Sequence, residues 1–208
     1  MLTETSRSHK RVSIVGSGYS MLTRDEVHRA LLDDALARRP GYVCVANVHT
    51  TMMGYFNPAY QRITNEAAYA LPDGLPLVWA MKSLGVASQD RVRGPTLMRD
   101  LVDLGRAHSL KHYFYGGTSE AVKALKAQLE KEFPGCEIVG AESPPFRALD
   151  AITPEEWEAE AARLNQSGAD LIWIGLGAPK QERWMWKQRN RVQAPMLGVG
   201  AAFDLLSG

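Results

Sequence analysis

The chain has 208 residues, of which 45% are hydrophobic and 23% are charged, and its net charge is +1. This length suits one well-buried α/β domain, and the near-neutral charge argues against a dedicated nucleic-acid binder, which usually carries a large basic excess. No apolar run approaches the roughly 18 residues of a membrane span, and the N-terminus lacks the apolar core of a signal peptide, so we expect a cytoplasmic protein for which any membrane contact is peripheral.

The amino-terminal segment predicts a tail, a strand and a helix. Residues 1–10 are polar and are expected to be disordered, so that residues 11–208 form the single domain. Val12–Val15 predicts a short strand, and the Gly-Ser-Gly turn behind it is only weak evidence for a nucleotide site. Thr23 and Glu26 have the spacing of a capping box and predict the start of a helix.

A polar residue interrupts the end of the next predicted strand. Tyr42–Val48 is an apolar run broken only by Asn47. The carboxyl end of a buried parallel strand is where ligands of open α/β sheets bind, but an Asn at this place can equally cap the following helix. Both roles stay open for Asn47.

An acidic residue follows the next strand in the same way. Ala68–Leu71 predicts a short strand, and Asp73 lies in the turn after it. From the residues alone, a cap for the next helix is favoured over a catalytic base. The buried face of that helix is expected to consist of Leu75, Val78, Trp79 and Leu84.

The middle of the chain adds a cation and a second glycine-rich turn. Arg91 lies in a loop, where an Arg is usually solvated, but its fixed charge and planar fork of donors suit a diphosphate. Lys111–Tyr115 predicts a strand that runs into Gly116-Gly117, a turn aimed at a helix N-terminus. After a further strand, Cys136–Ala141, the stretch Ser143–Arg147 predicts a surface loop over the site.

The sharpest local pattern is Gly-Leu-Gly-Ala-Pro-Lys-Gln-Glu at 175–182, directly after a predicted strand. Its proline predicts a helix start, so that Lys180 and Gln181 lie in the first helical turn. Free N–H groups and a partial positive charge gather there, so the turn with Gly177 can hold a phosphate or carboxylate, and Gln181 can point its amide at the same group. An ordinary strand-to-helix turn is the open alternative.

The helix after this turn is basic and aromatic. Arg183, Trp184, Lys187 and Arg191 follow at three- and four-residue spacings. One interpretation is a buried Trp184 with a solvated basic face. The other is that the face lies near an anionic membrane or a phosphate-bearing acceptor.

Strands and helices alternate from end to end, which predicts an α/β fold with a mostly parallel sheet and helices on both faces. Cys44 and Cys136 lie in separate apolar stretches and are expected to be buried free thiols. The chain has no Asp-x-Asp triplet, and its histidines show no ligand spacing. We therefore expect no metal and no cofactor.

Four segments together resemble the WecG/TagA/CpsF glycosyltransferases, glycosyltransferase family 26. They are VANV at 45–48, LPDG at 71–74 with RVRG at 91–94, GLGAPKQE at 175–182, and GVGAAFDLLSG at 198–208. Each motif is weak alone, but their order and spacing argue against a chance match.

The resemblance implies a Rossmann-like fold of the GT-E type and an inverting, metal-independent hexosyltransferase. Such enzymes move N-acetylmannosamine, its uronic acid or glucose from a UDP-sugar to a polyprenyl-diphosphate-linked acceptor at the inner membrane face, building teichoic acid, capsule or exopolysaccharide. The expected partners are these two substrates, the membrane surface and, as an open alternative, a second copy of the chain.

The resemblance also implies roles for single residues. Asp73 matches the proposed general base of the family, Asn47 matches a nucleotide contact, and Arg91 matches the family's arginine, whose charge suits the diphosphate. Asp204 would bind uracil or ribose, unless it caps a helix. The remaining expected substrate contacts are Thr50, Gly177, Lys180 and Gln181.

Two departures from the family pattern keep an alternative open. The family commonly has a Thr two residues before Asn47, where this chain has Val45, so Thr50 or His49 would have to substitute. Relatives also continue past the last motif with a membrane-docking extension, which we expect to be absent. A non-catalytic nucleotide-sugar-binding protein is therefore the alternative. An NAD oxidoreductase is disfavoured, because the Gly-Ser-Gly turn lacks the third glycine.

Overall fold

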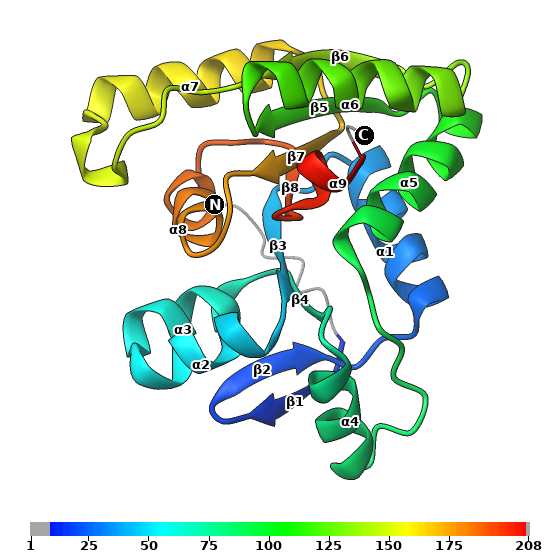
Figure 1. The fold of residues 1–208 in the computed structure, drawn as a ribbon, viewed down its shortest axis with the longest axis vertical. Coiled ribbons are helices and arrows are strands. Elements are labelled where there is room, and N and C mark those ends of the chain that lie inside the picture. The colour runs from blue at the N-terminus through cyan, green and yellow to red at the C-terminus, as the bar shows by residue number, and fades with distance from the viewer. Residues whose placement is uncertain (1–8, 207–208) are drawn as a thin grey trace.

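The structure, a computed structural model, describes residues 9–206 and is built on a six-stranded sheet whose neighbouring strands are all parallel. The strand order is β4-β3-β8-β7-β5-β6 (Figure 1). This confirms the predicted Rossmann-like α/β fold. The strands are β3 (Gly41–Ala46), β4 (Tyr69–Pro72), β5 (Lys111–Gly116), β6 (Glu137–Glu142), β7 (Leu171–Gly175) and β8 (Pro195–Gly198).

Helices cover both faces of this sheet, because side chains alternate between the faces along each strand. Leu171 and Trp173 pack with α1, α5, α6 and α9, whereas Ile172 and Ile174 pack with α3, α7 and α8. In Figure 1, α1 and α5 lie to the right of β3, and α3 and α8 lie to its left. The helices are α1 (Arg24–Leu36), α2 (Val48–Phe56), α3 (Pro58–Glu66), α4 (Leu75–Ser83), α5 (Gly94–Gly105), α6 (Ser119–Glu132), α7 (Pro154–Gln166), α8 (Lys180–Gln188) and α9 (Ala202–Leu206), with short 3-10 turns η1 (Arg106–His108) and η2 (Leu149–Ala151).

An antiparallel hairpin precedes the sheet, which the sequence analysis did not predict. Strand β1 (Arg11–Ile14) pairs with β2 (Ser17–Ser20), so that Ile14 lies opposite Ser17. Gly16 therefore lies in the hairpin turn and Ser17 and Gly18 begin β2, so the Gly-Ser-Gly segment does not lie between a strand of the main sheet and a helix. This removes the weak reason to place a nucleotide there.

The described end of the predicted tail is packed against the domain. His9 stacks on Tyr69 with 5.0 Å between ring centroids, and its Nε2 lies 2.8 Å from Ser20 Oγ. The carbonyl of Lys10 accepts a hydrogen bond from Met21 N. The rest of the expected disordered tail, residues 1–8, lies outside the described residues.

The predicted buried face of α4 is largely wrong. Val78 is buried as expected, but Leu75, Trp79 and Leu84 are exposed, and Leu77 and Met81 are buried instead. The reason is the hairpin, because α4 packs its inner side against β1 and β2 together with Ala46 and Ala70. A helical repeat alone does not tell which neighbour a helix will meet.

Other local predictions can be checked directly. Thr23 and Glu26 form the predicted capping box at the start of α1. Both cysteines are free, although Cys136 is half-buried and lies just before β6. Trp184 of α8 is buried, as one of the two interpretations of that helix requires.

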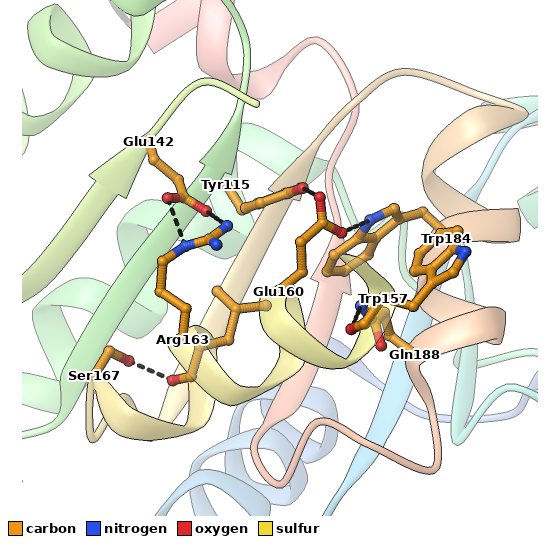
Figure 2. Close-up of polar contacts among 9 residues, drawn as sticks. Tyr115, Glu142, Trp157, Glu160, Arg163, Ser167, Trp184 and Gln188 are labelled. Atoms are coloured by element: carbon orange, nitrogen blue, oxygen red, sulfur yellow. Dashed lines mark hydrogen bonds and ion pairs between the residues drawn. The ribbon is translucent and has the colours of Figure 1, made fainter. Parts of the chain in front are cut away.

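A buried carboxylate fixes α7 to the sheet and to α8, as Figure 2 shows. Glu160 accepts hydrogen bonds from the hydroxyl of Tyr115 on β5 (3.0 Å) and from the indole N–H of Trp184 on α8 (3.3 Å). Gln188 Nε2 donates to the carbonyl of Trp157 (3.1 Å). Three elements of this face therefore meet at one polar side chain.

Replacing Glu160 with Ala should lower the free energy of unfolding by about 2–4 kcal/mol, because Tyr115 and Trp184 would each keep a buried donor without an acceptor. Urea denaturation at unchanged m value measures this loss. Glu158→Ala is the matched control, since among residues 9–206 the Glu158 side chain forms only an exposed ion pair with Arg191, and it should cost less than about 1 kcal/mol. Equal losses for the two variants would contradict the role given to Glu160.

Candidate active site

The carboxyl ends of the parallel strands bring most of the predicted site residues to one edge of the sheet. Asn47 follows β3, Asp73 follows β4, and Gly177 and Lys180 follow β7. The turns after β3 and β4 are in contact: Asp73 N donates to the carbonyl of Ala46 (2.7 Å). A Cβ on Gly74 would lie 3.6 Å from Asn47 Cα.

Asp73 and Arg91, which are 18 residues apart, form an ion pair at this edge. Arg91 Nη2 lies 3.2 Å from Asp73 Oδ1, and Nε lies 3.3 Å from the same oxygen and also donates to the backbone carbonyl of Asp73. Asp73 does not cap α4, because the capping position is Gly74 and has no side-chain bond. The cap favoured from the residues alone is therefore wrong.

The pair leaves polar atoms free on both partners. Within residues 9–206, neither Oδ2 of Asp73 nor Nη1 of Arg91 makes a hydrogen bond or ion pair. Both side chains are partly exposed. A carboxylate oxygen that can take a proton and an N–H that can bind an anion thus lie side by side.

Asn47 caps α2, which confirms the structural role among the two roles that the sequence left open. Its Oδ1 accepts from Thr50 N (3.1 Å), and Thr50 Oγ1 accepts from Asn47 N (3.0 Å). Asn47 is nevertheless exposed, and its amide NH₂ has no hydrogen-bond partner in the described part of the chain. Thr50 is buried with its hydroxyl engaged in the cap, and Val45 packs against the core. The nucleotide contact of Asn47 stays a prediction.

Gln181 points into the protein, contrary to the orientation expected from the sequence. It is buried, its Oε1 accepts from Gly200 N (3.0 Å), and its Nε2 donates to Glu182 Oε1 (2.8 Å). Burial raises the pKa of the Glu182 carboxyl, which is also buried. Gln181 thus ties the first turn of α8 to the turn after β8, and a direct substrate contact of its amide stays a prediction.

Lys180 lies between the β7 turn and the loop predicted to cover the site. Its Nζ is 5.0 Å from the centre of the Phe146 ring. That loop is held to the β5 turn by Ser143, whose hydroxyl donates to the carbonyl of Gly117 (2.6 Å). Gly177 has a φ of +74°, and the place of a Cβ there has no other atom within 4 Å, so the β7 turn borders open space.

Asp204 is exposed and lies within α9, in its first turn. Since α9 begins at Ala202, Asp204 is not the residue that precedes the helix and caps it. Next to it, Phe203 packs so tightly that a Cβ on Gly175 would lie 2.7 Å from its ring. A nucleoside contact of Asp204 stays a prediction.

The described part of the chain has neither a cluster of metal ligands nor a membrane-spanning helix. Among residues 9–206, no group of three or more His, Cys, Asp or Glu side chains is placed to hold a metal ion. No helix in the same range is long and apolar enough to cross a membrane.

The sequence analysis missed the residues that support the site. Gly200 donates its N–H to Gln181, and the exposed ring of Phe146 lies 5.0 Å from Lys180 Nζ, but neither residue was singled out. Gly200 lies in a glycine-rich motif, which is a usable signal for a tight turn. For Phe146 the sequence offers no signal, because its partner is distant in the chain.

Comparison with known proteins gives consistent matches. Residues 12–208 match the model of the Glycosyl transferase WecG/TagA/CpsF family. The chain is 29% identical over 168 residues to an N-acetylglucosaminyldiphosphoundecaprenol N-acetyl-beta-D-mannosaminyltransferase of Bacillus spizizenii, covering 80% of this chain and 62% of that protein. It is 26% identical to the protein of the same name from Staphylococcus aureus, covering 80% and 63%.

The matched region thus spans less than two thirds of the length of these relatives. The family model, in contrast, covers nearly the whole of this chain, including every site residue discussed above. The chain belongs to the WecG/TagA/CpsF glycosyltransferase family.

Proposed function

We propose that this protein is a hexosyltransferase of cell-surface polysaccharide synthesis. It transfers a sugar from a UDP-sugar to a polyprenyl-diphosphate-linked acceptor at the inner face of the cell membrane. The names of the relatives favour N-acetylmannosamine as the sugar and an N-acetylglucosaminyl diphosphate lipid as the acceptor. The observation that carries the proposal is the pairing of Asp73 with Arg91 at the carboxyl edge of the sheet.

In this proposal Asp73 is the general base. Its free Oδ2 takes the proton of the acceptor hydroxyl as that oxygen forms a bond to the anomeric carbon, while the bond from this carbon to the UDP oxygen breaks. A single displacement of this kind inverts the anomeric centre. Arg91 holds the carboxylate through Oδ1 and so keeps Oδ2 pointing away from the ion pair.

The leaving UDP carries the negative charge that develops in this step. Arg91 has a free Nη1 beside the base, and Lys180 brings a second cation from the start of α8, where the helix dipole adds partial positive charge. The exposed amide of Asn47 lies next to Asp73 and suits a nucleotide or sugar hydroxyl. No step in this scheme requires a metal ion.

The second candidate is a nucleotide-sugar-binding protein without turnover. One observation favours it: the hydroxyl of Thr50 is engaged in the α2 cap, so it does not replace the Thr missing at Val45. The two candidates differ in one measurement. Both bind UDP-sugar, and only the enzyme transfers the sugar to a lipid-linked acceptor.

Asp73→Asn should lower the rate of sugar transfer by about 10²- to 10⁴-fold while UDP affinity persists, because the amide keeps the size of the side chain but takes up no proton. Transfer to N-acetylglucosaminyl diphosphate lipid and calorimetry with UDP give the two readouts. Asp90→Asn is the control, a nearby carboxylate that bonds the start of α1, and it should transfer normally. Transfer by Asp73→Asn at the parent rate would exclude Asp73 as the base.

Arg91→Ala should weaken UDP binding by about 1.5–3 kcal/mol, the usual value of a hydrogen bond to a charged group. Arg93→Ala is the matched control, since Arg93 is also exposed and lies two residues away, and it should bind UDP like the parent. If both variants lost the same affinity, a general basic surface rather than Arg91 would account for binding.

UDP should bind with the same affinity in EDTA as with added Mg²⁺ or Mn²⁺, because Arg91, Lys180 and the start of α8 supply the positive charge. Calorimetry in the three buffers tests this. Binding that disappears on chelation and returns with the metal would overturn the metal-independent scheme.

A further inference from the structure

An amphipathic groove of about 560 Å³ lies beside the candidate active site, between α3, α8 and η2. We call it the α3–α8 groove, and its lining includes Tyr60, Ile63, Leu149, Arg183, Trp186 and Lys187. We infer that it binds the polyprenyl diphosphate part of the lipid-linked acceptor, an assignment that rests on the proposed function.

The groove has an apolar part formed from α3, η2 and α8, although Asn57, Arg62 and Asp150 also line it on the side of α3 and η2. Tyr60 and Ile63 are buried in the core and show only their outer atoms to the groove, and Leu149 and Trp186 pack half-buried against the same cluster. Such a surface suits the branched hydrocarbon units of a prenyl chain, which gain free energy when they leave water.

The groove is cationic along α8. Lys180, Arg183 and Lys187 all line it, at spacings that place them on one face of the helix over a length of about 10 Å. Within residues 9–206, the guanidinium of Arg183 makes no hydrogen bond or ion pair, although its charge acts on the neighbouring buried Glu182, and the Lys180 ammonium meets only the ring of Phe146. Lys187 lies 3.8 Å from Asp150, an almost fully exposed carboxylate.

These cations differ from the other Arg side chains of the same region. Arg62 is paired with Glu66, and Arg191, outside the groove, is paired with Glu158. The positive charge that has no close partner therefore collects where the groove passes α8. A diphosphate brings two adjacent anionic groups and matches this arrangement better than a single carboxylate does.

The position of the groove fits an acceptor better than a bilayer surface. Its lining includes Pro179 and Lys180, which start α8 directly after the β7 motif at the carboxyl edge. A diphosphate held at Arg183 would direct its sugar toward that edge and its hydrocarbon chain along Ile63 and Trp186. A concave surface encloses one chain, whereas a flat membrane contacts only the rim.

The test is calorimetry of the parent protein with farnesyl diphosphate, a short prenyl diphosphate, at saturating UDP so that the donor site is filled. We expect tighter binding of farnesyl diphosphate than of inorganic pyrophosphate or farnesol. Arg183→Glu should weaken it by about tenfold or more, the usual effect of losing a charge-assisted hydrogen bond. Leu149→Asn should weaken the binding of farnesyl diphosphate but leave the binding of pyrophosphate unchanged.

The matched control is Arg29→Glu, the same charge reversal at an exposed position of α1, across the sheet from α8. It should bind like the parent. The assignment is overturned if Arg183→Glu has no effect, if pyrophosphate binds as tightly as farnesyl diphosphate, or if UDP displaces the lipid. Binding to anionic phospholipid vesicles that depends on Arg183, without binding of farnesyl diphosphate, would also overturn it in favour of a bilayer contact.

The same protein samples separate this inference from the proposed function. If the parent binds UDP and transfers sugar while farnesyl diphosphate binding ignores Arg183, only the groove assignment fails. If the parent neither binds UDP nor transfers sugar, the proposed function fails, whatever the lipid titration shows. In transfer assays Arg183→Glu should raise the acceptor KM by about tenfold and leave the donor KM unchanged.

Discussion

The buried amide of Gln181 links the two strands at the centre of the sheet through the segments that follow them. Gln181 begins α8 after β7, and its Oε1 accepts the N–H of Gly200 in the turn after β8. Its Nε2 is in turn held by Glu182, so the amide has one orientation. Because the amide is enclosed, losing this bond would leave a buried polar group without a partner. The contact helps to hold the start of α8, which carries Lys180 and one side of the α3–α8 groove, against the turn that leads into α9.

The ion pair of Asp73 and Arg91 forms because the fold brings two separate turns to the same edge of the sheet. Each residue on its own has an ordinary structural explanation, a helix cap for the first and a solvated cation for the second. The hydrogen bond from Asp73 N to Ala46 places the β4 turn against the start of α2, and Arg91 then reaches back over it. Asn47, Asp73 and Arg91 thereby gather although the helices α2, α3 and α4 and the strand β4 separate Asn47 from Arg91 in the chain.

The sequence was sufficient for the sheet but not for what packs against it. The apolar runs predicted the central strands, because a strand buried on both faces carries a continuous hydrophobic signal. The same reasoning failed for α4, where the hairpin β1–β2 decides which side is buried. The sequence also did not predict the direction of the Gln181 side chain, since a glutamine in a first helical turn can face a ligand or the protein. Its inward direction depends on the hydrogen bond from Gly200 N, a contact that the sequence does not reveal. Motif spacing placed Asp73 at the right edge, while its ion pair required the fold.

The close packing around Gly116 has a consequence for how this chain can vary. A Cβ on Gly116 would lie 2.5 Å from the carbonyl of Gly175, and a Cβ on Gly175 would meet Phe203 at 2.7 Å. Gly116, the backbone of Gly175 and the ring of Phe203 are therefore packed in a row. A larger side chain at either glycine would displace its neighbour. In a mutational scan scored by growth, these positions would look as intolerant as Asp73, although they lack any reactive group. Intolerance to substitution at the glycines would reflect the close approach of β5 and β7. A binding or turnover assay would be needed to distinguish this packing effect from the loss of a catalytic group.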